Sequence, residues 1–172
     1  MGKSKSLSVP KEVMHPLFYT ENGEKVNVES QQPDPLNPVF SYEILFYNNL
    51  PVIAKPWEAS SYIKKAEMKW QGIKEELDAA FSARSGDEIK SLMKKGIALF
   101  MMYLFWTNAM PSKPAMWKEN LDKMNVKPVN VLERLSFVLM HHSLFHSYKQ
   151  LDQLFIEQLK QYAKNQAMLK QK

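Results

Sequence analysis

The run from Ile97 to Trp106 has no polar gap, although it lies in a lysine-rich part of the sequence. A helix that is apolar on all sides must be buried on all sides, inside a protein or in a membrane. A membrane-spanning helix needs about 20 apolar residues, and this run is bounded by Lys94-Lys95 and Thr107-Asn108. We therefore expect a central buried helix, over about residues 87–109, in an all-α core.

The rest of the chain favours a single-domain bundle of five or six helices. A chain of 172 residues is long enough for one domain with its own core. Apolar residues at spacings of three and four, interrupted by Pro, Asn and Gly, mark the helices. They predict helices over residues 41–49, 60–83 and 87–109, and others beginning near Pro114, Asn130 and Ser147.

Two of these helices begin with a capping signature. Ser85 precedes Glu88, and Asn130 precedes Glu133, at the spacing in which the first side chain caps the helix. In the helix after Asn130, the expected buried face consists of Leu132, Leu135, Val138 and Leu139.

Residues 1–40 differ in composition, because they hold five of the ten prolines. Proline at this density prevents long helices. The segments 18–20 and 26–28 flank the turn pair Asn22-Gly23, which is typical of a small hairpin. The alternative is an extended arm laid over the helical body. We therefore divide the chain into a proline-rich arm, residues 1–40, and a helical domain, residues 41–172.

The net charge of +5 is concentrated in two lysine-rich segments, 91–130 and 158–172. Only two of the 23 basic residues are arginine, the side chain whose planar fork reads phosphates and guanine edges. This composition argues against sequence-specific DNA binding and leaves a diffuse, salt-sensitive attraction to polyanions. The residues expected to contact nucleic acid in that case are Lys94, Lys95, Lys123, Lys127, Lys160 and Lys164.

Two residue patterns in the sequence have the spacing or composition of a metal site. His142 and His146 would share a face if both lay on one helix, which is a spacing that zinc sites use. No third ligand is evident, and histidines at a helix end are the alternative. Asp34 with Glu67 and Lys69 has the residue types of a magnesium-dependent nuclease, but that chemistry needs the last two on a strand, whereas here they lie in a helical stripe.

Other signatures of catalysis are missing from the sequence. The five glycines do not form a phosphate-binding loop, and there is no Gly-x-Ser-x-Gly elbow. We therefore expect no catalytic residues, no cofactor and no enzymatic activity. Asn108, Glu133 and Arg134 border apolar helices and are candidates for a hydrogen-bonded polar core.

The composition indicates a reducing compartment. The chain has no cysteine, which excludes disulfides and thiolate metal sites, and it begins without the apolar stretch of a secretory signal. We expect a cytoplasmic protein that does not bind a membrane.

Four stretches of the chain resemble the YpoC-like family of bacterial proteins. They are Tyr42-Glu43-Ile44-Leu45-Phe46-Tyr47 with the later Pro56-Trp57, Gly96-Ile97-Ala98-Leu99-Phe100 with Leu104-Phe105-Trp106-Thr107-Asn108, Lys127-Pro128-Val129-Asn130-Val131-Leu132-Glu133-Arg134-Leu135, and His146-Ser147-Tyr148-Lys149-Gln150-Leu151. The similarity covers roughly residues 40–164. It implies an all-helical cytoplasmic protein without an established activity. Genes of the family often lie near those of a replication-initiation protein and a base-excision endonuclease, an association that favours DNA metabolism.

Three functions follow as hypotheses. The first is a non-enzymatic protein-interaction module that uses an exposed groove or the C-terminal helix to bind a protein partner. The second is a weak, non-sequence-specific nucleic-acid-binding accessory protein linked to DNA replication or repair. The third is a metal-dependent enzyme built on His142 and His146.

Overall fold

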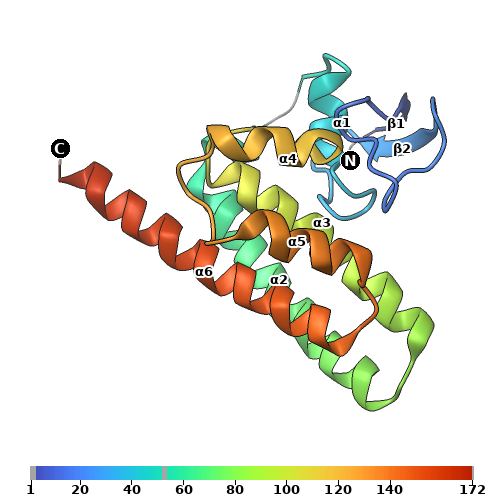
Figure 1. The fold of residues 1–172 in the computed structure, drawn as a ribbon. Coiled ribbons are helices and arrows are strands. Elements are labelled where there is room, and N and C mark those ends of the chain that lie inside the picture. Colours follow the sequence, from blue (N-terminus) through green and yellow to red (C-terminus); the bar gives the residue numbers. More distant parts are fainter. Residues whose placement is uncertain (1–2, 52–53, 172) are drawn as a thin grey trace.

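The computed structural model describes residues 3–51 and 54–171 and confirms a mainly α-helical chain (Figure 1). A two-stranded antiparallel sheet precedes the helices. In order, the elements are β1 (Ser4–Ser8), β2 (Lys25–Glu29), α1 (Ser41–Tyr47), η1 (Pro56–Glu58), α2 (Ser60–Ser82), α3 (Gly86–Trp106), η2 (Pro114–Met116), α4 (Trp117–Asn120), η3 (Leu121–Lys123), α5 (Val131–Met140) and α6 (Phe145–Lys170).

The apolar run forms the second half of α3, as predicted. Every residue from Ile97 to Trp106 is buried, with at most 2% of its surface exposed. Helix α3 packs against both α2 and α6, which lie side by side with it in the lower half of Figure 1. It ends at Trp106, three residues before the predicted boundary at 109, and Ala109 then adopts a positive φ of 58°.

Glycine lets α2 and α3 approach closely. A β-carbon placed on Gly96 of α3 would lie 2.8 Å from Cζ3 of Trp70 on α2. Atoms of real side chains do not approach that closely, so the indole packs directly on the glycine backbone. Trp70 also stacks on Phe155 of α6, with ring centroids 4.4 Å apart. These contacts hold the three longest helices together at one level of the core.

The helix ends and the face of α5 differ from the predictions. Neither Ser85 nor Asn130 makes a side-chain cap hydrogen bond, and Asn130 instead occupies the left-handed region at φ 55°. The buried residues of α5 are Val131, Leu135 and Val138, whereas Leu132 is 42% exposed and Leu139 is only half-buried. Burial on a short helix follows the one stripe that meets a neighbour, and here α6 is that neighbour.

The predicted hairpin between residues 18–20 and 26–28 is wrong. Strand β2 pairs with β1, so that Val26 faces Leu7 and Val28 faces Lys5. Phe18 and Tyr19 lie in a turn and are both buried. Successive residues of a strand point to opposite faces, so a hairpin strand would have left one of these aromatic rings outside.

Residues 3–40 contribute to the same hydrophobic core as the helices. The buried side chains from this segment are Val9, Val13, Phe18, Tyr19, Val28 and Phe40. The backbone N–H of Ala115, in η2, also donates to the carbonyl of Glu12 at 3.0 Å. An arm packed outside the body is therefore not confirmed.

Candidate interaction surface at the end of helix α6

The last turns of α6 extend beyond the body of the molecule, at the end marked C in Figure 1. Gln158 is the last buried residue of the helix, and none of the described residues after it is buried. From Leu159 to Lys170 the helix is about 18 Å long at 1.5 Å per residue. The body of the molecule therefore covers this end of α6 only weakly.

The two faces of this segment differ chemically. Tyr162 and Gln166 border a groove, and Leu169 shares their face because it lies two turns from Tyr162. Lys160, Lys164 and Met168 follow one another at intervals of four on the opposite face. Residues 159–170 include three lysines and no acidic residue. The end of α6 is therefore amphipathic and basic.

The groove beside the apolar face has a volume of about 460 Å³. It lies between the end of α6, the η1 turn with the start of α2, and the end of α3. Trp57 and Ile63 form its apolar lining on one side and Tyr162 borders the other. Trp57 and Ile63 are each 5% exposed. The lining also includes polar residues, among them Glu58, Ser60 and Gln166, so a partner would meet a mixed apolar and polar surface here.

A buried polar network fixes the point where α6 leaves the body. The side-chain amide of Gln158 donates to Oγ1 of Thr107 at 2.8 Å and to the carbonyl of Val126 at 3.0 Å. The Asn108 amide bonds both backbone groups of Val126, donating to the carbonyl at 2.7 Å and accepting from the N–H at 2.9 Å. Asn108 was selected from the sequence as a polar-core residue. Gln158 was missed, because a glutamine within an amphipathic helix resembles a surface residue.

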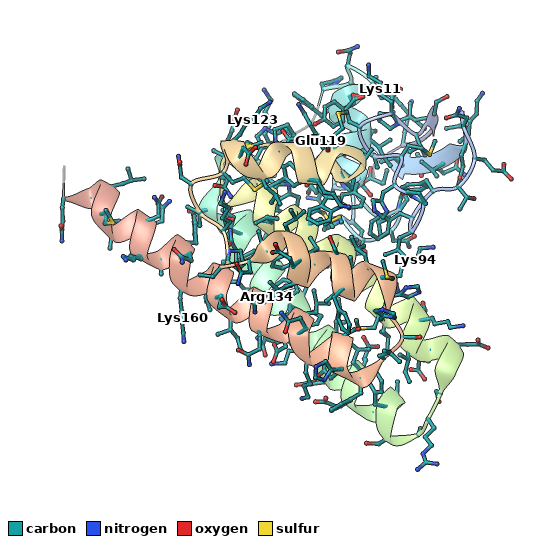
Figure 2. All side chains as sticks on the ribbon, in the orientation of Figure 1. Lys11, Lys94, Glu119, Lys123, Arg134 and Lys160 are labelled. Atoms are coloured by element: carbon teal, nitrogen blue, oxygen red, sulfur yellow. The ribbon has the colours of Figure 1, made fainter. Side chains whose placement is uncertain are left out.

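The other two predicted polar-core residues lie nearer the surface. Nη1 of Arg134 donates to Oε1 of Glu157 at 2.9 Å and to the carbonyl of Val129 at 2.9 Å. Glu133 is exposed. Arg134 therefore joins α5 to α6 through an ion pair at the edge of the core, where Figure 2 shows it between these helices.

The six lysines selected as nucleic-acid contacts do not gather on one face. In Figure 2, Lys94 and Lys160 lie at opposite sides of the molecule, and Lys123 lies beside α4. Lys127 is half-buried, and its ammonium donates to the carbonyl of Leu121 at 2.9 Å. Only Lys160 and Lys164 share a helix face. Nucleic-acid contact by these residues stays a prediction.

The two histidines with metal-site spacing do not lie on one helix. α5 ends at Met140, so His142 falls in the following turn, whereas His146 is the second residue of α6. Within residues 3–51 and 54–171, no three His, Cys, Asp or Glu side chains are arranged to hold a metal ion. The regular spacing of one helix turn is lost because the chain turns between the two rings.

The acid–acid–lysine pattern is divided between two places. Lys69 lies 3.9 Å from Asp34, but Glu67 accepts a hydrogen bond from the Tyr103 hydroxyl at 2.9 Å. Glu67 and Lys69 both lie on α2, and residues two apart on a helix point in different directions. The predicted helix over this pattern is confirmed.

A fully buried carboxylate, Glu43 in α1, was not predicted. One of its oxygens accepts from the Trp106 indole N–H at 2.7 Å and from the Ser112 backbone N–H at 3.0 Å, and the other has no partner. Burial raises the pKa of Glu43 above its ordinary value, and the hydrogen bonds from Ser112 and Trp106 offset part of that rise. An acid inside the apolar segment Tyr42–Phe46 was the signal available in the sequence.

A second exposed apolar cluster surrounds the turn between α5 and α6. Met140 is 76% exposed, Phe145 53%, Leu144 49% and Phe137 38%. Phe137 also borders a hollow of about 290 Å³ with Glu133 and His146. Charges of both signs surround this cluster, since Glu133 and Arg134 line the hollow and the Lys149 ammonium lies 5.2 Å from the ring centroid of Phe145.

Helices in the described ranges are all too short or too polar to cross a membrane.

The comparisons with known proteins point to one family. The family model described as YpoC-like protein matches residues 60–170. Over 115 residues, 66% of this chain and 70% of the relative, the sequence is 35% identical to "Uncharacterized protein YpoC" of Bacillus subtilis (strain 168). No solved structure matches the chain. The chain, whose helices α2 to α6 lie within the matched region, belongs to the YpoC-like family.

Proposed function

We propose that this protein is a non-enzymatic interaction module of the bacterial cytoplasm that binds an acidic amphipathic helix of a partner protein along the end of α6. The observation that carries the proposal is the absence of any buried residue in the described part of α6 after Gln158. Within that segment Leu159 is 41% exposed and Leu169 55%. Covering such side chains with a partner is favourable, at roughly 25 cal/mol per Å² of apolar surface.

The groove supports a helical partner. A helix that lays its apolar face into a groove uses side chains at intervals of three and four residues. The groove of about 460 Å³ has Trp57 and Ile63 on one side and Tyr162 on the other. A partner leucine or phenylalanine placed between them would extend the existing core.

The charge supports an acidic partner. Lys160, Lys164 and Lys170 have no acidic residue among them in the segment 159–170. The groove lining itself holds one acid, Glu58, and the lysines at 160 and 164 face away from it. A helix is about 10 Å across, close to the Debye length at physiological salt, so the field of the lysines reaches a partner that lies along α6 and favours carboxylates on the side of the partner away from Glu58.

The test is fluorescence anisotropy with two labelled helical peptides that share a leucine face and carry either glutamate or lysine on the other face. We expect the acidic peptide to bind with a Kd in the micromolar range, and the basic peptide at least tenfold more weakly. The Leu169→Ser variant should bind the acidic peptide more weakly than the wild type does. Met168→Ser is the matched control, since Met168 and Leu169 are both 55% exposed but point about 100° apart around the helix, with Met168 turned away from Tyr162. Equal binding of both peptides, or equal effects of both variants, would contradict the proposal.

The nucleic-acid-binding alternative is tested by the same method, with DNA in place of the peptides. Lys160 and Lys164 are one turn apart on an exposed helix face, a spacing that can contact neighbouring phosphates. Labelled single- and double-stranded DNA would be titrated at several salt concentrations. DNA binding that falls steeply with salt and is lost in Lys160→Gln/Lys164→Gln, together with no binding of the acidic peptide, would favour the accessory function in replication or repair.

A further inference from the structure

A separate cavity of about 380 Å³ lies between α1, α2, α3 and the segment 32–35. Small-molecule sites in proteins are clefts of about 300–1,000 Å³ with apolar walls and a few polar groups. This cavity shares only Trp106 with the groove beside α6. It therefore constitutes a second place where the molecule can take up a ligand.

The floor of the cavity is apolar. Ala66, Leu99 and Trp106 line it, and each is at most 2% exposed. The indole N–H of Trp106 is already bonded to Glu43, so the ring offers the cavity its carbon atoms. Tyr42 and Tyr62 line the cavity too, with ring centroids 5.6 Å apart in an edge-to-face arrangement. These surfaces suit a flat apolar or aromatic group.

The mouth of the cavity is positively charged. Lys65 and Lys69 lie one turn apart on α2 and both line the cavity, against a single carboxylate, Asp34. The Lys65 ammonium lies 4.8 Å from the ring centroid of Tyr62, and none of the ion pairs found among the described residues includes it. Lys69 lies 3.9 Å from Asp34, longer than the 2.7–2.9 Å of a charge-assisted hydrogen bond. Both ammonium groups are therefore available to an incoming anion.

We infer that this cavity binds a small aromatic anion, with its ring against Ala66, Leu99 and Trp106 and its carboxylate or phosphate between Lys65 and Lys69. The anion takes the place of Asp34 beside Lys69. Such a ligand matches the cavity in both parts, because a ring alone leaves Lys65 without an anionic partner among the described residues and a bare anion leaves the apolar floor uncovered. The same volume would be poorly filled by an alkyl chain, which has no flat face to set against the rings.

The experiment is isothermal titration of the full chain with two aromatic anions, indole-3-acetate and uridine 5′-monophosphate. Indole, uridine and inorganic phosphate serve as probes that carry only half of the recognised chemistry. We expect at least one anion to bind, and its half-probes to bind at least tenfold more weakly. Binding of indole-3-acetate alone would identify the anion as a carboxylate, and binding of the nucleotide alone would identify it as a phosphate.

Two sets of variants make the test specific. Lys65→Gln/Lys69→Gln should weaken binding at least tenfold, whereas Lys64→Gln should leave it unchanged, because Lys64 is exposed and pairs with Glu67 on the other side of the helix. Ala66→Leu should fill the floor and abolish binding, and a melting curve establishes that this variant is folded. If neither anion binds, or if the Lys65/Lys69 variant binds as well as the Lys64 variant, the inference is overturned.

Discussion

The carboxylate of Glu43 accepts a hydrogen bond from the indole nitrogen of Trp106 at 2.7 Å, and both side chains are buried. This bond joins the short helix α1 to the end of the central helix α3. It also sets the orientation of the Trp106 ring, which lines both the cavity and the groove. The stability of α1 and the shape of both candidate sites therefore depend on one buried acid.

Glu43 should make stability depend on pH. Its pKa in the folded protein lies above the ordinary value of 4.5. Protonated Glu43 therefore contributes fully to stability below about pH 4.3, and this contribution is lost as the pH rises through the folded-state pKa. Glu43→Gln resembles the protonated acid, so its free energy of unfolding should fall less between about pH 4.5 and neutral pH. Urea denaturation across that range measures this difference, and equal slopes would contradict it.

Glu43→Ala should destabilise the protein at every pH. The substitution leaves the Trp106 N–H and the Ser112 backbone N–H buried without an acceptor. An unpaired buried donor costs about 1–3 kcal/mol. The same urea denaturation measures the loss. A variant as stable as the wild type would mean that water replaces the carboxylate.

Gly96→Ala and Gly72→Ala should have opposite effects. Alanine favours a helix over glycine by about 1 kcal/mol, and around Gly72 no atom lies within 4 Å of the added β-carbon. At Gly96 that carbon would lie 2.8 Å from Trp70 and 3.3 Å from Leu151. Overpacking of a core costs about 1–3 kcal/mol. Thermal denaturation should therefore show a lower Tm than the wild type for Gly96→Ala and a higher Tm for the control variant, Gly72→Ala.

Asn108→Ala should destabilise the loop that passes Val126. Its amide is the partner of both the N–H and the carbonyl of Val126, and Val126 is 4% exposed. We expect a loss of about 1–3 kcal/mol in the free energy of unfolding, since the Val126 N–H becomes an unpaired buried donor. Asn125→Ala is the matched control, because Asn125 is exposed in the same loop, and its effect should stay within about 0.5 kcal/mol.

Zinc should leave the thermal stability unchanged. A ligand that binds only the folded state raises Tm, but His142 and His146 lie in different elements and gain no third ligand among the described residues. A melting curve with and without zinc, and the same pair of curves for His142→Ala/His146→Ala, measures this. A zinc-dependent rise in Tm that the double variant lacks would restore the metal-site hypothesis.

The long helices could be predicted because each buries a continuous pattern. The stripe from Ile63 to Leu77 places α2, and the run from Ile97 to Trp106 places α3. Such patterns are local and repeat over several turns. The strand pairing was not predictable in the same way. Leu7 pairs with Val26, and a local sequence pattern does not indicate which distant segment a strand will pair with.

The polar contacts required the tertiary structure. Gln158 and Glu43 are buried because α3 and the loops at 112 and 126 pass over them. Nothing in α6 marks Gln158 as interior, and for Glu43 the only local signal is its apolar neighbours in α1. Leu132 is the converse case, an apolar residue on α5 that no neighbouring element covers. The cavity with Lys65 and Lys69 also depends on segment 32–35. This segment lies far from α2 in the sequence and meets it only in the folded chain.

The bond between Ala115 and Glu12 has a consequence for folding during synthesis. It closes a loop of more than half the chain, and the core needs both Val9 near the start and Leu154 in α6. Contacts between residues this far apart slow folding, because the loop entropy is lost before the contacts form. A ribosome adds about 5–20 residues per second, so the apolar side chains near the start of the chain cannot be fully buried until α6 has been synthesised. The nascent chain therefore exposes Phe18 and the apolar half of α3 for seconds, and we expect it to be a substrate for chaperones until translation is complete.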